Sequence, residues 1–254
     1  MHPMGITLPK PLELLDIATP ADIVRLMKSV PLFLDTTAAQ RRNLAGKLSL
    51  RGLPANSTIM ERGENTGCVY IVLSGSVKIF VVRPGEYPTL IGLLGHGEVL
   101  GELSALDGSF HSASVCTLER SRFLHMERSD FVQALHEVPV LSLNLARLLA
   151  RRLRRITDQF EAMASLDVPG RVVRQLLIFA HDYGREADDG GTVIPLRLTQ
   201  ADLAGLTGSS RERVNKTIAF HRRQGDLTLN AGHHFTLHDG EAMATYHRLP
   251  WPLW

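Results

Sequence analysis

Apolar residues recur at intervals of three and four between residues 146 and 163, and this spacing constrains the fold more than any other feature of the chain. The residues are Ala146, Leu149, Leu153, Ile156, Phe160 and Met163. Such steps place all six on one narrow stripe of a helix, as in the seam of a coiled coil. The other faces of this helix carry Arg147, Arg151, Arg152, Arg154 and Arg155. A helix buried within a monomer normally has a broader apolar stripe. The seam therefore predicts that two copies of the chain pair along this helix, and the alternative is that it packs on its own domain.

Short apolar runs separated by glycine turns precede this helix, between about residues 48 and 128. The runs cover residues 68–74, 77–82, 89–94, 112–118 and 122–126. Several short strands at roughly ten-residue spacing predict an all-β sandwich, roll or barrel. Glycines such as Gly75 fit the turns because glycine adopts positive φ at low cost.

The pattern changes again after the seam. Pro169-Gly170 predicts the end of the helix or a bend in it. An amphipathic helix follows over residues 171–181, and a turn-rich loop lies at 188–191. Residues 232–237 are typical of one arm of a small hairpin.

Two short helices joined by a glycine-containing turn are predicted within residues 199–224. Thr199 and Asp202 have the spacing of a capping box. Thr207-Gly208 forms the turn, and Ser209-Ser210-Arg211-Glu212 matches the pattern of a second capping box. This arrangement is typical of a helix-turn-helix.

The second of these helices concentrates positive charge. From Ser209 to Gln224 it carries five basic side chains against Glu212, a local charge of +4 in a chain whose formal net charge is +2. An arginine near the start of a recognition helix can donate two hydrogen bonds to guanine, and a glutamate can accept one from cytosine. We predict DNA binding, with Arg211 and Glu212 at base edges and Arg222 at phosphate. The alternative is a solvated amphipathic helix. The predicted DNA-binding residues are Thr199, Gln200, Ser210, Arg211, Glu212, Arg213, Asn215 and Lys216.

The overall composition is that of a soluble globular chain, with 44% hydrophobic and 21% charged residues in 254 positions. No uncharged apolar run approaches the roughly 18 residues of a membrane-spanning helix. Lys10, Glu13 and Asp16 stand where a signal peptide would have its apolar stretch. We therefore expect a cytoplasmic protein.

The cysteine pattern and the absence of catalytic motifs exclude several classes. Cys68 and Cys116 are far apart and form no CxxC pair, so the chain lacks the thiolates for an iron–sulfur cluster or a structural zinc. We expect no metal site, and both cysteines as small core residues in a reducing compartment. Because no Ser–His–Asp, metal-ligand or P-loop spacing is present, we expect no enzyme.

Together these regions resemble the cyclic-AMP receptor protein and fumarate–nitrate regulator (Crp/Fnr) superfamily of bacterial transcription regulators, over roughly residues 30–240. Residues 69–78 are similar to the family's signature hairpin. Residues 166–171 are similar to its passage from dimer helix to DNA-binding domain, and 210–216 to its Ser-Arg-Glu-x-Val-x-Arg recognition helix. By this resemblance Arg211 and Glu212 are the principal base readers, and Lys216 stands in place of a third reader, an arginine.

The resemblance implies an α+β fold and a homodimer on a palindromic operator, with RNA polymerase as a further partner. The fold would combine an N-terminal β-roll of the cyclic-nucleotide-binding type, a long dimerisation helix and a C-terminal winged helix-turn-helix. The expected regions are an N-terminal extension at 1–29, the effector-sensing roll at 30–137, the dimerisation helix at 138–165 and the DNA-binding domain at 166–254. The dimer interface would contain Leu149, Leu153, Ile156, Phe160 and Met163.

Residues 101–113 are similar to the phosphate-binding cassette of cyclic-nucleotide-binding rolls. By the resemblance, backbone N–H groups and the Ser112 hydroxyl would cradle a phosphate, and Glu102 would accept from a ribose hydroxyl. The cassette's arginine falls on His111, which supplies only partial charge and no planar fork. The family's two nucleobase-contacting hydroxyl positions fall on Ile156 and Thr157. The candidate effector-binding residues are Gly101, Glu102, Leu103, His111, Ser112, Ala113, Ile156 and Thr157.

The effector itself stays open at this point. The candidates are cyclic AMP, another nucleotide such as cyclic di-GMP, a different small ligand or none. Haem is also weighed because the chain contains 11 histidines and one axial ligand suffices. A rival from another class is a regulatory interaction module with vestigial DNA binding.

Overall fold

The computed structural model describes residues 19–82, 88–187 and 190–251. Internal contacts divide these residues into two units. Unit 1 contains the described residues up to Lys78 together with His96–Leu145, and unit 2 contains Ile79–Gly95 and the described residues from Ala146 on.

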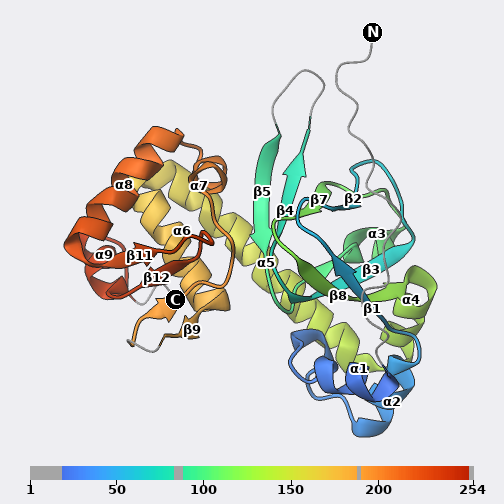
Figure 1. Ribbon diagram of the computed structural model, residues 1–254. Coiled ribbons are helices and arrows are strands. Elements are labelled where there is room, and N and C mark those ends of the chain that lie inside the picture. Colours follow the sequence, from blue (N-terminus) through green and yellow to red (C-terminus); the bar gives the residue numbers. More distant parts are fainter. Residues whose placement is uncertain (1–18, 83–87, 188–189, 252–254) are drawn as a thin grey trace. The chain divides into compact units, whose positions relative to one another are not determined.

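Antiparallel strands in two sheets form the roll predicted for the N-terminal half (Figure 1). One sheet has the order β1-β8-β3-β6 and the other β2-β7-β4-β5. The strands are β1 (Ser49–Leu53), β2 (Thr58–Met60), β3 (Cys68–Ser74), β4 (Val77–Val81), β5 (Thr89–Leu94), β6 (Val99–Leu100), β7 (Ser114–Thr117) and β8 (Ser121–Glu127).

The central strand β3 shows why the glycine-punctuated runs form a roll. Val69, Tyr70, Ile71 and Val72 are all buried, so both faces of the strand are covered. Gly75 follows with φ at +84°, a conformation that favours glycine, and a Cβ there would collide with Ser121 on β8. The turn after β3 therefore requires glycine at position 75.

Short helices flank the sheets of unit 1. They are α1 (Pro20–Met27), the 3₁₀ turn η1 (Pro31–Phe33), α2 (Ala38–Ala45), α3 (Glu102–Asp107) and α4 (Arg128–Glu137). Helix α1 begins at a capping box formed by Thr19 and Asp22, and its Ile23 and Met27 are buried. The end of the predicted N-terminal extension thus contributes to the core of unit 1.

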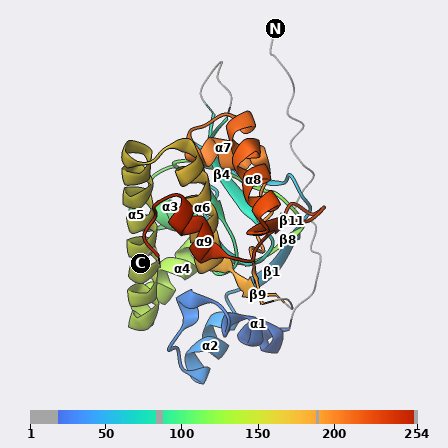
Figure 2. The same ribbon diagram turned by 90° about the vertical axis from the view of Figure 1, so that its left-hand side faces the viewer.

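Helix α5 (Pro139–Ser165) runs without interruption for 27 residues (Figures 1 and 2). One face is buried through Leu141, Leu145, Leu148 and Ala162. The seam predicted from the sequence lies on a different face. One face of α5 therefore packs against its own chain, and a second apolar face is exposed to solvent.

The remaining helices and strands of unit 2 follow α5 in the chain. Asp167 caps α6 (Val168–Tyr183) by accepting the Gly170 N–H at 2.8 Å, so Pro169-Gly170 belongs to the first turn of a new helix. A small sheet of order β11-β12-β10-β9 lies beside the helices. The remaining elements are β9 (Arg185–Glu186), β10 (Thr192–Val193), α7 (Gln200–Thr207), α8 (Arg211–Gln224), β11 (Leu227–Leu229), β12 (Phe235–Leu237) and α9 (Gly240–Tyr246).

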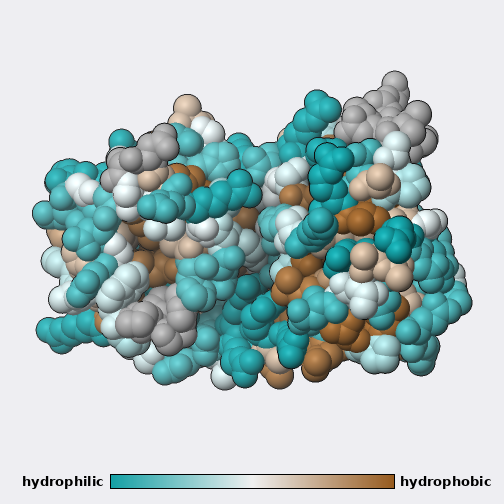
Figure 3. Space-filling view, turned by 90° about the horizontal axis from the view of Figure 1, so that it is seen from below, coloured by the Kyte–Doolittle hydropathy of each residue, from teal (hydrophilic) through white to brown (hydrophobic). Residues whose placement is uncertain are grey.

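Both units expose large hydrophobic side chains, in unit 2 among them Leu153, Ile156, Phe160 and Met163. Figure 3 shows hydrophobic side chains gathered on the visible face of unit 1, on the right, whereas unit 2 shows smaller hydrophobic areas among hydrophilic ones. In unit 1 the large hydrophobic side chains that are exposed include Leu34, Leu103, Leu106, Phe110 and Leu143.

Candidate DNA interface and effector pocket

The α7–turn–α8 segment forms the helix-turn-helix predicted from the sequence. Thr199 and Asp202 make the expected capping box at the start of α7. Gly208 ends α7 in the left-handed region, at φ +59°, which lets the chain turn sharply into α8. The second predicted capping box is wrong. Ser210, not Ser209, is the N-cap of α8 and accepts the Arg213 N–H, which puts Glu212 one position too early to close a box.

Burial of one face of α8 fixes which side chains point outward. Val214, Ile218 and His221 are almost completely inaccessible, and Thr217 is buried between them. The spacing of three and four along the helix places these residues on a single side. The exposed side then carries Arg211, Glu212, Arg213, Asn215, Lys216, Arg222 and Arg223.

Hydrogen bonds organise this exposed face. Glu212 Oε1 lies 2.7 Å from Lys216 Nζ one turn further on, and the hydrogen bond and charge of Lys216 lower the pKa of Glu212. Gln200 on α7 donates from Nε2 to Oδ1 of Asn215 at 3.0 Å. Six predicted DNA-binding residues, Gln200 and Arg211 to Arg213 with Asn215 and Lys216, thus lie together. Thr199 and Ser210 use their hydroxyls as helix caps.

Residues that the sequence analysis did not single out anchor the C-terminal end of α8. Nδ1 of His221 lies 2.6 Å from an Asp226 carboxylate oxygen, and its Nε2 lies 2.9 Å from Nε2 of His247. Burial and the neighbouring His221 lower the pKa of His247. A histidine pair with an aspartate at the other ring nitrogen has no spacing signature, because its members come from α8, a turn and the end of α9.

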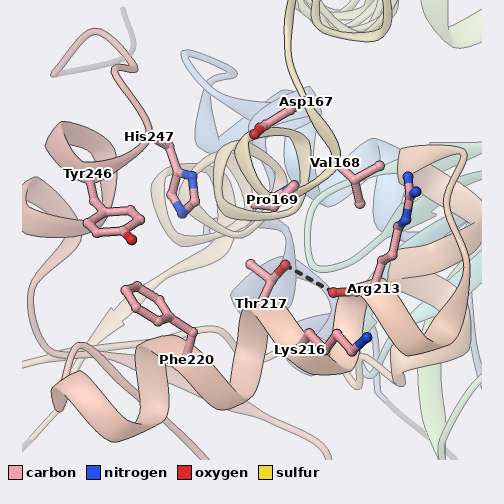
Figure 4. Close-up of a pocket in the computed structure, with 9 residues that line it drawn as sticks. All are labelled: Asp167, Val168, Pro169, Arg213, Lys216, Thr217, Phe220, Tyr246 and His247. Atoms are coloured by element: carbon pink, nitrogen blue, oxygen red, sulfur yellow. Dashed lines mark hydrogen bonds between the residues drawn. The ribbon is translucent and has the colours of Figure 1, made fainter.

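A cavity of about 410 Å³ lies behind α8 (Figure 4). Its walls come from the start of α6, the inner edge of α8 and the end of α9. The tilted rings of Phe220 and Tyr246, with centroids 4.7 Å apart, lie on one side, and the side chains of Arg213 and Lys216 lie on the other. The cavity separates the first turns of α8 from α9, so the N-terminal end of α8 is held mainly by α6 and α7.

The predicted seam of α5 is exposed along its length. Leu153 is 66% exposed, Phe160 70%, Ile156 45% and Met163 44%, and Leu149 is half-buried. Large apolar side chains in a continuous stripe are costly in water, since each loses about 1.5–3 kcal/mol of burial energy. The alternative that the seam packs on its own domain is therefore wrong for the described chain.

In unit 1, the cassette segment contains helix α3. Gly101 precedes α3 with φ at +80°, and Glu102 at its first position is only 3% exposed. Leu103 and Ser112 are exposed, and Ala113 is half-buried. Ile156 and Thr157 lie in unit 2, both on the exposed side of α5, and Thr157 Oγ1 donates to the Leu153 carbonyl.

His111 is the cassette residue with the best-defined surroundings. Its Nε2 accepts the Thr66 N–H at 3.2 Å and lies 3.0 Å from Thr66 Oγ1, and its Nδ1 lies 3.0 Å from Ser104 Oγ. Accepting from a backbone N–H requires a lone pair on Nε2, so the ring is neutral with its proton on Nδ1. Burial also lowers the pKa of His111, against a smaller opposing effect of Glu64. His111 therefore acts as an uncharged cross-link between the Thr66 turn and α3.

Comparison with known proteins gives both halves of the chain a family. Residues 50–138 match the model of the cyclic nucleotide-binding domain, and residues 170–246 match that of the Crp-like helix-turn-helix domain. A CRP-like cAMP-activated global transcriptional regulator of Mycobacterium tuberculosis is 35% identical over 191 residues, which cover 75% of this chain and 84% of the relative. The chain belongs to the Crp/Fnr superfamily. The Cyclic AMP receptor protein of Thermus thermophilus is a second Crp/Fnr relative, 31% identical over 207 residues, with 81% and 92% of the two chains covered.

Solved structures share the fold. FixK2 from Bradyrhizobium japonicum has a TM-score of 0.67 at 18% identity, covering 78% of this chain and 96% of its own. The c-di-GMP responsive regulator CLP of Xanthomonas campestris has a TM-score of 0.63 at 23% identity, covering 79% and 99%. The expected α+β architecture of nucleotide-binding roll, long helix and helix-turn-helix is confirmed.

The Crp/Fnr assignment makes the chain a DNA-binding transcription regulator with a cyclic nucleotide-binding domain. The curated relatives are named as a regulator and a receptor, in agreement with the expectation that the chain is no enzyme. No helix among the described residues is both long and apolar enough to cross a membrane.

The structure corrects the expectation for one cysteine of this Crp/Fnr chain. Cys116 is buried, as expected of a core residue, but Cys68 is only partly buried at the start of β3. The first residue of a strand lies at the edge of the roll, where its side chain reaches solvent, and residue type alone does not show this.

Proposed function

We propose that the chain acts as a homodimeric transcription regulator that binds a two-fold symmetric operator. The observation that carries this proposal is the exposed face of α8, where four arginines and a lysine gather on a helix whose other face is buried. A helix that is buried on one side and basic on the other fits the major groove and neutralises phosphates at its edges. In this proposal residues 30–137 sense an effector, 138–165 dimerise and 166–254 bind DNA.

The exposed seam of α5 supports the dimer. Pairing two seams would bury Leu149, Leu153, Ile156, Phe160 and Met163 of each copy, and the arginines beside the seam would stay in water. Two α8 helices related by a dimer axis would enter successive major grooves about 34 Å apart. The operator would then be palindromic. RNA polymerase is a further partner in this proposal, and the cytoplasm is where it would act.

Within the interface we assign different roles to different residues. Arg211 and Glu212, in the first turn of α8, would contact base edges, and Arg213, Asn215 and Lys216 would support them. Thr199, Gln200 and Ser210 stand at the two helix starts, where backbone N–H groups meet phosphate. Arg222, at the far end of α8, would contact phosphate only.

Paired substitutions separate these roles. We expect Arg211→Ala to remove the preference for the cognate site, a loss of about 1–3 kcal/mol on that sequence alone. We expect Arg222→Ala to weaken cognate and scrambled duplexes alike and to lower the salt slope by about one. Competition gel shifts at two salt concentrations measure both effects. Equal losses for the two variants on both duplexes would contradict the assignment of Arg211.

For the effector, we propose cyclic AMP bound weakly by a cassette that lacks a cationic phosphate ligand. Support comes from the two cAMP-named relatives and from Glu102, Ser112 and Ala113, which stand at matching positions of the cassette. The neutral His111 side chain cannot make a charge-assisted hydrogen bond to a phosphate. Such a bond contributes about 1.5–3 kcal/mol to binding. The affinity should accordingly be roughly ten to a hundred times lower than with arginine at this position.

A second candidate is a regulator that works without a cyclic nucleotide. It is favoured by the hydrogen bonds of His111, whose two ring nitrogens already face Thr66 and Ser104. Calorimetric titration of the purified protein with cyclic AMP, in parallel with cyclic di-GMP, decides between the two. Heat of binding with cyclic AMP supports the first candidate. Absence of heat at millimolar ligand supports the second, and a haem absorption band in purified protein would point to neither.

A further inference from the structure

Three side chains of metal-ligating type lie together at one edge of the roll, outside the effector cassette. Cys68 comes from β3, and His125 and Glu127 come from β8, which pairs with it. In the antiparallel register Cys68 is opposite Glu127, and Tyr70 is opposite His125. Residues two apart on a strand share a face. The pairing of β3 with β8 therefore brings the three ligand types onto the same face of the sheet.

The ligand atoms of the three side chains are slightly farther apart than the ligand atoms of a zinc site. Cys68 Sγ lies 3.9 and 4.0 Å from the two Glu127 carboxylate oxygens, and His125 Nε2 lies 3.8 Å from Glu127 Oε1. All three ligand atoms lie within 4.8 Å of one another. In a tetrahedral zinc site with bonds of about 2.0–2.3 Å, ligand atoms are about 3.3–3.7 Å apart. Movements of about 1 Å or less would close the site.

His125 is held in the orientation that a metal ligand needs. It is 8% exposed, and its Nδ1 lies 3.3 Å from Oγ of Ser49, its partner on β1. This contact directs Nε2 toward Glu127, as outer hydrogen bonds commonly do for metal-binding histidines. Burial and the charge of Arg51 lower the pKa of His125, which favours the neutral ring that binds metals.

The edge of the site is open to solvent. The Glu127 side chain is 60% exposed and Cys68 is partly buried, so an ion can enter and a water can complete its coordination. A thiolate, an imidazole and a carboxylate together suit a borderline ion such as Zn²⁺, whereas Mg²⁺ and Ca²⁺ require oxygen ligands.

We propose that Cys68, His125 and Glu127 bind one zinc-class divalent ion, with water as the fourth ligand. Binding exchanges the Cys68 thiol proton, which leaves to solvent, for the metal–sulfur bond. The two anionic ligands balance the dication, and the adjacent Arg51 charge adds one positive unit. We therefore expect an exchangeable site that is weaker than a closed four-ligand structural zinc. The spacing of these residues in the sequence indicates no metal site, since only the pairing of β3 with β8 brings them together.

The position of the site connects it to the cassette. In the metal-free chain Cys68 Sγ donates to the Thr66 carbonyl at 3.1 Å, and a metal-bound thiolate has no proton to donate. Thr66 is also the residue that hydrogen-bonds to His111. Thr66 would thus connect the bound ion to His111 of the effector cassette.

Titration with Co²⁺ tests the site directly. The probe is the full-length, reduced and metal-free protein, without DNA or nucleotide, so the result is independent of the proposed function. We expect one Co²⁺ per chain with the intense charge-transfer band of a cobalt–thiolate bond, and its loss when Zn²⁺ is added. Cys68→Ser should abolish the band, and Cys116→Ser, the matched control at the other cysteine, should leave it unchanged. A missing band in the wild type, or a band that survives Cys68→Ser, overturns the proposal.

Two further variants test the other contacts without disturbing the core. Glu127→Gln, at an exposed position, should weaken Co²⁺ binding about tenfold or more. Ser49→Ala removes the contact that positions His125. Loss of such an outer hydrogen bond typically lowers metal affinity about 10–100-fold. Circular dichroism checks that both variants fold. Unchanged affinity in folded Glu127→Gln would reject the three-ligand site.

Discussion

The candidate functional side chains of helix α8 are exposed, whereas two of those in the segment 101–113 are buried. Arg211, Glu212 and Lys216 lie on a solvent-exposed face, and Glu212 and Lys216 contact each other across a single turn. In the cassette, Glu102 and His111 are buried, and His111 is hydrogen-bonded at both ring nitrogens.

The two segments differ in whether the residues that match a family motif are exposed enough to contact a partner. On α8, the residues that match the family motif also have the exposure that contact with DNA requires. In the cassette, one residue at a matching position is already used by its own chain. A motif therefore predicts contact with a partner better where the fold leaves the side chains in water.

Charge placed on the exposed seam of α5 should separate the proposed dimer. Each copy would otherwise bury Leu153 and Phe160, with about 1.5–3 kcal/mol per side chain. We expect the double variant Leu153→Asp, Phe160→Asp to have a monomer's mass by light scattering, and Arg151→Asp, an exposed residue outside the seam, to remain a dimer. A double variant that keeps the dimer mass would show that the seam is not the interface.

His111→Arg should convert the inward-facing cassette residue into an outward-facing one. The longer, always charged side chain can reach a phosphate, so we expect the affinity for cyclic AMP to rise about tenfold to a hundredfold. Calorimetry measures the change, and His111→Gln is the uncharged control that should show no gain. If arginine and glutamine behave alike, position 111 is not the phosphate contact.

The stability of the chain should fall as the pH drops below about 6.5. Burial lowers the pKa values of His111, His125 and His247 below that of an unfolded histidine, 6.5. The unfolded state then binds more protons between the folded and unfolded pKa values, so this stability is complete above pH 6.5 and is lost below it. Each histidine contributes a slope of at most about 1.4 kcal/mol per pH unit.

Urea unfolding at a series of pH values measures this dependence. His111→Gln should reduce the slope because one of the three histidines no longer titrates. A slope that is unchanged in this variant would show that His111 is not shielded from protonation in the folded state.

The corrected cap of α8 predicts the smallest effect. Ser210→Ala should cost about 1 kcal/mol in the stability of unit 2, the usual value of an N-cap. Ser209→Ala should cost less, because the Ser209 hydroxyl contacts only Thr207 Oγ1, at 2.9 Å. A larger loss of thermal stability in Ser209→Ala than in Ser210→Ala would show that Ser209 is the N-cap, as the sequence predicts.

Features carried by neighbouring residues could be predicted from the sequence alone. Strand β3, helix α5 and the first helix of the helix-turn-helix follow from local periodicity and local capping, which depend on residues within a few positions. The charge on α8 is local in the same sense. These features also located the candidate DNA interface.

Features that depend on tertiary pairing could not be predicted in this way. The contacts of His111 with Thr66 and Ser104 require the roll to close, and those of His221 with His247 require α9 to pack against α8. The partial exposure of Cys68 follows from its place at the end of strand β3. The second capping box failed for a smaller reason, since two adjacent serines offered two caps and the turn geometry chose Ser210.

Selection of binding sites from a random duplex pool tests the central claim most directly. We expect the wild-type protein to enrich an inverted repeat whose half-sites are about one helical turn apart, bound by two copies of the chain. Arg211→Ala should enrich no such repeat while still binding duplex DNA at low salt. Failure of the wild-type protein to enrich any sequence, or enrichment of single, unpaired half-sites, would contradict a dimeric regulator and favour an interaction module with vestigial DNA binding.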